Sequence, residues 1–335
     1  MHNVVRRMDR NEMPFPPEGE VVRAASAALL TSNRYPSWDA AGLRSLLAES
    51  FAVSPDWVAV GSGSISVIQQ AMIAAGPGEL LLPWPTFEGI PMLASALRMD
   101  LRRTGLRPDG SCDIAEMTAQ ITPATRMVVV CTPNTPTGGI VRHDELAEFV
   151  AGVPRDVLVL VDEAYVEFVT APDVARSLDL VRAHPNVLMT RTFSKAYGLA
   201  GFRVGYGIAQ PALAGPIRAA GIPFTLSAAA EAAAMRALRS RAVMEARVRS
   251  INAERLRLTT ALRALGLEVA DGHGNFVWLA HPGDSDAIAG ELAASAVLVK
   301  AYSGHGIRIS VGTGADTARL LSVWPTRSTK LQRAS

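Results

Sequence analysis

The chain has 335 residues, of which 49% are hydrophobic and 19% charged, and its formal net charge at pH 7 is +2. This composition excludes a disordered chain, and the small net charge gives no sign of a nucleic-acid or anionic-membrane partner. The two cysteines, Cys112 and Cys131, have no metal-like spacing and are too few for a disulfide framework. Since no run approaches the roughly 18 apolar residues of a spanning helix, we expect a cytoplasmic protein that binds neither membrane nor metal.

Short β-branched runs alternate with helical patterns over the first two thirds of the chain. The runs lie at 57–60, 79–83, 127–131, 157–163 and 186–193. Several are apolar throughout, as in strands that are buried on both faces. Helical patterns such as 66–75 and 144–152 separate them. The alternation predicts an α/β fold in which helices sandwich a mostly parallel sheet.

The pattern changes after residue 227, where a helix-forming stretch without proline runs to about Leu265. We interpret it as the connection to a smaller α+β domain with two or three helices. Its expected strands are 266–270, 275–280, 296–301 and 306–312. The expected organisation is an N-terminal arm over 1–25 that packs on the small domain and the cleft, a large domain over 26–230, a small domain over 231–325 and a tail over 326–335.

In open α/β sheets, ligands bind beyond the carboxyl ends of the strands. The first strand leads into the turn GSGSIS at the start of a helix, where backbone N–H groups suit a phosphate. A plain tight turn, or a dinucleotide fingerprint with Ser66 in place of its third glycine, are alternatives. Phe87 follows the second strand, either as a surface on which a planar cofactor stacks or as a core residue. The third strand precedes an ordered loop of neutral hydrogen-bonding groups, TPNTPTGG.

The next two strand ends carry charged groups. Asp162 and Glu163 end an apolar strand just before Tyr165. A buried carboxylate needs a partner, and a cationic ring nitrogen, a salt bridge and a helix N-cap would each serve. Lys195 follows the last run among hydroxyl residues, and Arg203 comes eight positions later. An amine there can form a Schiff base with a carbonyl cofactor, while the hydroxyls and the arginine bind its phosphate.

The chain carries, in order, the Gly/Ser turn, the aromatic residue Phe87, PNTPTG, DEAY and SKAYGLAGFRVGY. This series of motifs resembles that of the fold-type I pyridoxal-phosphate aminotransferases. The resemblance is to the histidinol-phosphate aminotransferase-like group, nearest to its aromatic or phenylalanine branch, and runs from about Asn11 to Thr313. It implies a homodimer with shared active sites and pyridoxal 5'-phosphate as cofactor. The implied reaction is ping-pong transamination between an aromatic or imidazole-bearing amino acid (phenylalanine, tyrosine or histidinol phosphate) and a 2-oxo acid such as 2-oxoglutarate.

The resemblance also implies residue roles. Lys195 would hold the cofactor covalently and move the substrate proton, Asp162 would pair with the ring nitrogen, and Tyr165 would hydrogen-bond the phenolic oxygen. The other cofactor-binding residues would be Ser64, Ile65, Phe87, Asn134, Thr135, Thr192, Ser194, Arg203 and, across a dimer interface, Tyr35. The substrate-binding residues would be Arg308, which would take the α-carboxylate, together with Asn275 and Lys300.

Three features depart from the pattern of that group. Thr135 stands where an asparagine is usual, NEMPF lacks a tyrosine that some members place near a substrate phosphate, and Lys300 stands where an arginine is common. The last two features weigh against a phosphorylated substrate. Because cofactor-binding residues do not separate the reactions of one fold, a lyase or decarboxylase resembling threonine-phosphate decarboxylase and a specialised biosynthetic enzyme stay open. A ligand-sensing module and a dinucleotide-binding dehydrogenase are further alternatives. Such a sensor would carry an N-terminal DNA-binding domain, for which an arm of about 20 residues leaves no room.

Overall fold

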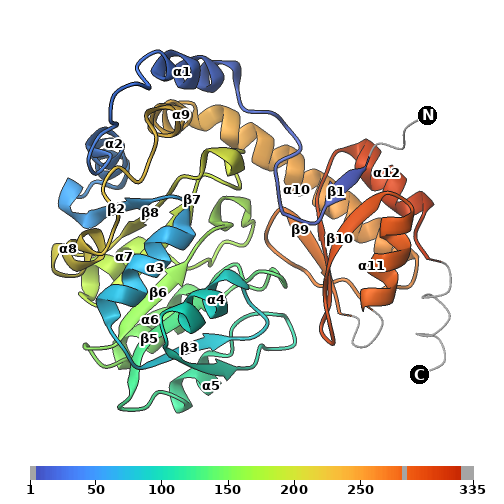
Figure 1. Ribbon diagram of the computed structural model, residues 1–335. Helices are drawn as coiled ribbons and strands as arrows, with labels where there is room; N and C mark the ends of the chain where they lie inside the picture. The colour runs from blue at the N-terminus through green and yellow to red at the C-terminus, as the bar shows by residue number, and fades with distance from the viewer. Residues whose placement is uncertain (1–4, 281–284, 326–335) are drawn as a thin grey trace.

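The computed structural model describes residues 5–280 and 285–325, which form two sheets with their helices (Figure 1). The larger sheet has seven strands in the order β2-β8-β7-β6-β5-β3-β4. These are β2 (Val58–Gly61), β3 (Glu79–Pro83), β4 (Asp100–Thr104), β5 (Thr125–Cys131), β6 (Leu158–Asp162), β7 (Val187–Thr192) and β8 (Gly205–Ile208). Only β8 runs antiparallel to its neighbours, β7 and β2. The predicted mostly parallel α/β sheet is therefore confirmed.

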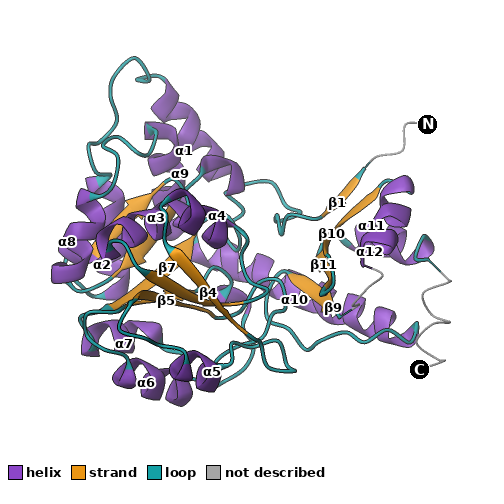
Figure 2. Ribbon diagram, turned by 60° about the horizontal axis from the view of Figure 1, so that its bottom comes forward, coloured by secondary structure: helices purple, strands orange, loops and turns teal. Residues whose placement is uncertain are grey.

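Helices cover both faces of this sheet (Figure 2). On one face lie α3 (Ser64–Ala75), α4 (Gly89–Ala96) and α8 (Pro211–Ala219). On the other lie α2 (Ala41–Phe51), α5 (Ile114–Ala119), α6 (His143–Gly152), α7 (Ser177–Ala183) and α9 (Ala228–Arg239), and α1 (Gly19–Leu29) packs beside α9. Short 3-10 helices are η1 (Pro55–Trp57), η2 (Val166–Phe168) and η3 (Ala200–Phe202).

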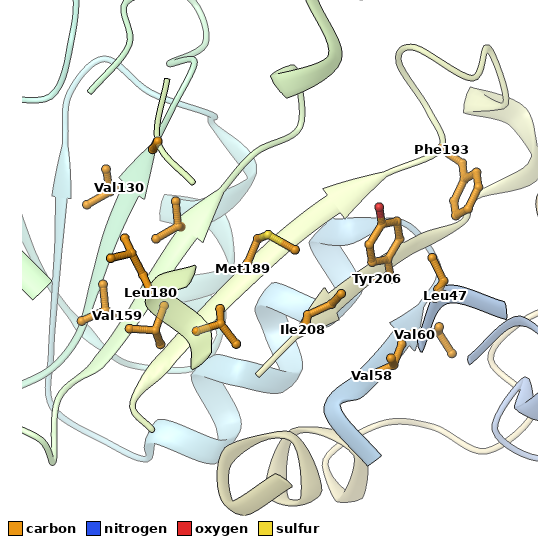
Figure 3. Close-up of a cluster of buried hydrophobic side chains, with 14 of the residues drawn as sticks. Leu47, Val58, Val60, Val130, Val159, Leu180, Met189, Phe193, Tyr206 and Ile208 are labelled. Carbon is orange, nitrogen blue, oxygen red and sulfur yellow. The ribbon is translucent and has the colours of Figure 1, made fainter. Parts of the chain in front are cut away.

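The central strands carry continuous apolar runs because each face of the sheet has its own core. In β5, Val128 and Val130 belong to one hydrophobic cluster, while Met127 and Val129 belong to the cluster on the opposite face. Figure 3 shows Val130 in the first cluster beside neighbouring strand residues. The rigid, buried strands fix where their carboxyl ends, and the residues beyond them, are placed.

Two strands of this sheet were not predicted. β4 (DLRRT) lies at the sheet edge and is only partly buried, so its sequence lacks an apolar pattern. β8 (GYGI) contains two buried glycines, which are unfavourable in strands unless another chain segment approaches closely. A Cβ on Gly205 would lie 2.0 Å from the Ser64 backbone nitrogen, and one on Gly207 would lie 2.9 Å from Val67 Cγ1 of the same helix. Packing of the helix α3 against β8 therefore selects these glycines.

The smaller sheet has the order β1-β10-β11-β9, with β1 (Arg6–Met8), β9 (Phe276–Leu279), β10 (Val297–Tyr302) and β11 (Gly306–Ser310). Its helices are α10 (Arg241–Ala264), α11 (Ser285–Ala294) and α12 (Gly314–Ser322). The helix-forming stretch after residue 227 is thus two helices, α9 and α10, that meet at Ser240. β1 comes from the N-terminal arm and pairs in parallel with β10. The arm therefore crosses from the small sheet to the large one, as Figure 1 shows.

The strand predicted at 266–270 was wrong. The chain leaves α10 through Gly266, whose φ is +82°, and only Val269 forms an isolated bridge, with Leu279. The expected domain limits stay a prediction, and the expected tail over 326–335 lies outside the described residues. In the described ranges no helix combines the length and apolar character needed to cross a membrane.

Candidate active site

A cavity of about 580 Å³ lies at the carboxyl ends of the central parallel strands, between the two sheets. Its walls come from the segments after β6 and β7, the start of α3, the N-terminal arm, and β10 and β11. The structure brings together here all but three of the predicted site residues. These are Ser64, Ile65, Phe87, Thr135, Asp162, Tyr165, Thr192, Ser194, Lys195, Arg203, Lys300 and Arg308.

The three exceptions are Asn134, Asn275 and Tyr35. The Asn134 side chain is turned into the loop, where it accepts from Thr86 Oγ1 at 2.8 Å and donates to Thr137 Oγ1 at 2.8 Å. Asn275 Nδ2 donates to the Asn11 carbonyl at 2.9 Å. Both amides hold neighbouring chain segments and neither lines the cavity, while Asn275 Oδ1 has no partner among the described residues, so their predicted ligand contacts stay predictions.

Tyr35 lies away from the cavity of its own chain. Its side chain is 85% exposed and stacks on Phe224, with 4.9 Å between the ring centroids. Only a neighbouring copy of the chain would bring this tyrosine to a cavity, so its predicted role depends on the oligomeric state.

The start of α3 and the segment after β7 form a positively charged recess. The first N–H groups of α3, at Ser64 and Ile65, have no acceptor within the helix. Opposite them, Arg203 Nη1 donates to Ser194 Oγ at 3.3 Å. A Cβ on Gly63 would lie 2.4 Å from Arg203 Nη2, so glycine leaves the guanidinium its space. No ion pair within residues 5–280 and 285–325 engages Arg203, which leaves it available for a phosphate group.

The two adjacent carboxylates, Asp162 and Glu163, have different environments because neighbouring strand residues point to opposite faces. Glu163 is buried against Arg191, with 2.8 Å between Oε2 and Nε, so it forms the structural salt bridge. Asp162 is 2% exposed, lines the cavity and accepts only from Thr190 Oγ1, at 3.1 Å, among side chains of the described residues. Burial raises the pKa of Asp162 to about 6, against the opposing effect of the Thr190 hydrogen bond. A cationic ring nitrogen would supply the partner that this carboxylate lacks.

Lys195 and Tyr165 face each other beneath the N-terminal arm. Lys195 Nζ donates to the carbonyl oxygens of Arg10 at 3.2 Å and Asn11 at 3.3 Å, and lies 5.7 Å from the centre of the Tyr165 ring. Asn11 Nδ2 donates to Tyr165 Oη at 2.9 Å. The amine thus has only neutral partners and opens onto the cavity, as a nucleophile for a carbonyl group requires.

Arg308 occupies the wall formed by the small sheet. Its side chain donates to Thr135 Oγ1 and Tyr302 Oη, each at 3.2 Å, and to the Asp9 carbonyl at 2.7 Å. The residue is 9% exposed, all these acceptors are neutral, and Nε has no partner in the described chain. A buried guanidinium without a carboxylate can bind an anionic ligand, and a substrate carboxylate matches its forked donors.

The cavity lining combines apolar surface with one ion pair. Phe87, Ile65 and Tyr302 contribute aromatic and aliphatic side chains. Lys300 Nζ lies 3.2 Å from Glu88 Oε2, another lining residue, so the charge of this lysine is already compensated. Glu88 was not predicted, although its position next to Phe87 was a signal.

Sequence reasoning also missed Asn11, Ser310 and Tyr302. Ser310 and Arg308 are two apart on β11, so strand alternation would have placed them on one face. Asn11 lies in an irregular segment and carried no comparable signal. Its position depends on contacts with residues at the other end of the chain.

The residues present fit pyridoxal phosphate: a recess for its phosphate, an unpaired buried carboxylate for its ring nitrogen, and an amine for its aldehyde. The model of the family "Aminotransferase class I and II" matches residues 5–323. An aromatic amino acid aminotransferase from Cutibacterium acnes is 39% identical over 317 residues, which cover 94% of this chain and 90% of that protein. One from Thermobifida fusca is 40% identical, with 95% and 89% covered.

Solved structures share the fold. A putative histidinol-phosphate aminotransferase from Erwinia carotovora atroseptica superposes with a TM-score of 0.90 at 24% identity, covering 98% of this chain and 97% of that one. The histidinol-phosphate aminotransferase from Sinorhizobium meliloti, solved with pyridoxal-5'-phosphate, gives 0.87 at 24% identity, with 98% and 92% covered. With the family model matching almost the whole chain, this protein belongs to the class I and II aminotransferases, which are pyridoxal-phosphate-dependent transaminases.

Proposed function

We propose that the protein transfers the amino group of an aromatic amino acid, such as phenylalanine or tyrosine, to a 2-oxo acid such as 2-oxoglutarate. One observation carries the choice of an aromatic substrate. The cavity lining offers aromatic and aliphatic side chains, while Lys300 in the same lining is paired with Glu88 at 3.2 Å. Because that charge is compensated, a phosphorylated side chain such as that of histidinol phosphate gains less there. The names of the relatives with 39% and 40% identity support the same choice.

The proposed roles follow from the contacts in the cavity. When bound, pyridoxal phosphate supplies an aldehyde and an electron-accepting ring. The start of α3, Thr192, Ser194 and Arg203 would bind its phosphate, and Asp162 would hold the proton on its ring nitrogen. Phe87 would lie against its ring.

Two further residues would act on the substrate. Arg308 would bind the α-carboxylate and so orient the Cα–H bond, with Thr135 beside it. Lys195 Nζ would hold the aldehyde of the cofactor until a substrate amine replaces it, and would then remove the proton from the substrate Cα and later return one. The aliphatic and aromatic walls would exclude water from this proton.

The experiment compares visible absorption spectra of wild type and Lys195→Ala after addition of pyridoxal phosphate, followed by a donor screen. We expect an absorption band that depends on Lys195 and is bleached by phenylalanine or tyrosine, with formation of the corresponding 2-oxo acid. Bleaching by histidinol phosphate alone would contradict the aromatic assignment. Release of carbon dioxide instead of a 2-oxo acid would identify a decarboxylase.

We also propose a cytoplasmic homodimer in which Tyr35 completes the partner's phosphate recess. The exposed apolar side chains Leu30, Tyr35, Trp38 and Ile222 support this, because monomers rarely expose such a set. Buried free thiols support the cytoplasm. Sedimentation should give a dimer, and a fully active monomer on dilution would refute the shared site.

A further inference from the structure

Asn11 is a fully buried residue of the N-terminal arm that contacts both Lys195 and Tyr165. It has 0% exposure, and its φ of +53° lies in the left-handed region that asparagine tolerates better than most residues. Its carbonyl accepts from Lys195 Nζ at 3.3 Å and from Asn275 Nδ2 at 2.9 Å. Its side chain lies between Tyr165 Oη and Ser310 Oγ, at 2.9 Å from each.

The directions of these hydrogen bonds follow from one group that can only donate. The Asn11 backbone N–H lies 2.7 Å from Ser310 Oγ, so the serine oxygen accepts there. Among the described residues, the buried Ser310 hydroxyl has no other acceptor than Asn11 Oδ1, so its single proton is directed there. The opposite end of the amide, Nδ2, must therefore face Tyr165 and donate to its oxygen.

This arrangement determines where the proton of Tyr165 goes. Because Tyr165 Oη accepts from Asn11, its own hydroxyl proton points away from the arm. Within the described ranges, the Tyr165 side chain makes no other hydrogen bond, and it lines the cavity. Its proton is therefore available to an acceptor inside the cavity.

We propose that Asn11 is a positioning residue which, with Ser310, fixes the Tyr165 hydroxyl as a donor toward the phenolic oxygen of the bound cofactor. This proposal rests on the proposed function and on the contact of Tyr165 with the phenolic oxygen that the family resemblance implies. The carbonyl oxygen of Asn11 also accepts from the Lys195 amine. One residue of the arm therefore positions both the Tyr165 hydroxyl and the Lys195 amine. An aspartate at position 11 has nearly the same shape but presents an oxygen to Tyr165, and would draw the tyrosine proton away from the cofactor.

The test measures the pyridoxal phosphate dissociation constant and the pH midpoint of the visible band of the loaded protein. Without a donor, the phenolic oxygen retains a proton more strongly, so the midpoint moves upward. We expect Asn11→Asp to move it by about one pH unit and to weaken binding about tenfold, and Ser310→Ala to give a smaller change of the same sign. The nearby charged groups, Asp162, Lys195 and Arg308, stay unchanged in each variant.

A matched control separates positioning from general loss of stability. Asn186 is another buried asparagine, whose Nδ2 donates to the Val157 carbonyl at 2.9 Å far from the cavity, so Asn186→Asp should lower stability without moving the midpoint. Tyr165→Phe should move it upward. If Tyr165→Phe moves the midpoint while Asn11→Asp and Ser310→Ala leave it at the wild-type value, the proposal is overturned. If Tyr165→Phe leaves the midpoint unchanged, the contact between Tyr165 and the phenolic oxygen is also contradicted. If the wild-type protein does not react with aromatic amino donors, only the proposed substrate is contradicted.

Discussion

Replacing Asp162 with asparagine should stabilise the cofactor-free protein at neutral pH. Burial raises the pKa of this carboxyl from 3.8 to about 6, so the folded protein binds a proton between these values that the unfolded chain releases. Folding of the wild type therefore weakens as the pH rises through this window. At 1.36 kcal/mol per pKa unit, the charged carboxylate costs about 3 kcal/mol above pH 6. The asparagine avoids this cost and can still bond Thr190.

Urea unfolding at a series of pH values measures the difference. The variant should exceed the wild type by about 3 kcal/mol above pH 6, and the two should converge below about pH 4, where both states of the wild type are protonated. Added pyridoxal phosphate should reverse the order, because only the aspartate gains a cationic partner. A gain that persists below pH 4, or no gain at pH 8, would refute the account of Asp162 as an uncompensated buried charge.

Three other substitutions test neighbouring features. Gly63→Ala should weaken the binding of pyridoxal phosphate at least about tenfold, because the new Cβ would displace Arg203. The binding of pyridoxal, which has no phosphate, should weaken much less. Equal losses for the two ligands would contradict the phosphate assignment. Glu163→Gln should lower the free energy of unfolding by about 3 kcal/mol through loss of the buried pair with Arg191, without altering the visible band. Arg308→Gln should lower kcat/KM about a hundredfold for amino-acid and oxo-acid substrates alike, with cofactor affinity nearly unchanged; loss for one substrate only would argue against a shared carboxylate site.

The large sheet and most of the site were predictable because both depend on local signals. Strands buried on two faces leave apolar runs that need no knowledge of their partners. Once those runs are assigned, the carboxyl-end rule places Asp162 and Lys195 at one edge of the sheet. The family resemblance then adds the roles.

The errors arose where distant contacts decide the outcome. Asn134 and Thr135 are adjacent and both polar. Contacts with Thr137 and with the distant segment that contains Thr86 turn the amide inward, while the threonine lines the cavity. β8 was missed because its glycines are set by the approach of α3. No local pattern could reveal that Asn11 pairs with a serine 299 residues away.

The parallel pairing of β1 with β10 has a consequence for synthesis of the protein. The arm emerges from the ribosome before the strand it pairs with has been made, and at roughly 5–20 residues per second the delay is about 15–60 seconds. During that time the large sheet can fold, but the residues that hold Lys195 and Tyr165 from the arm have no anchor on β11. The cavity is therefore completed at the end of folding. In a nascent chain that lacks the small sheet, the arm that contacts Lys195 is not yet held in place.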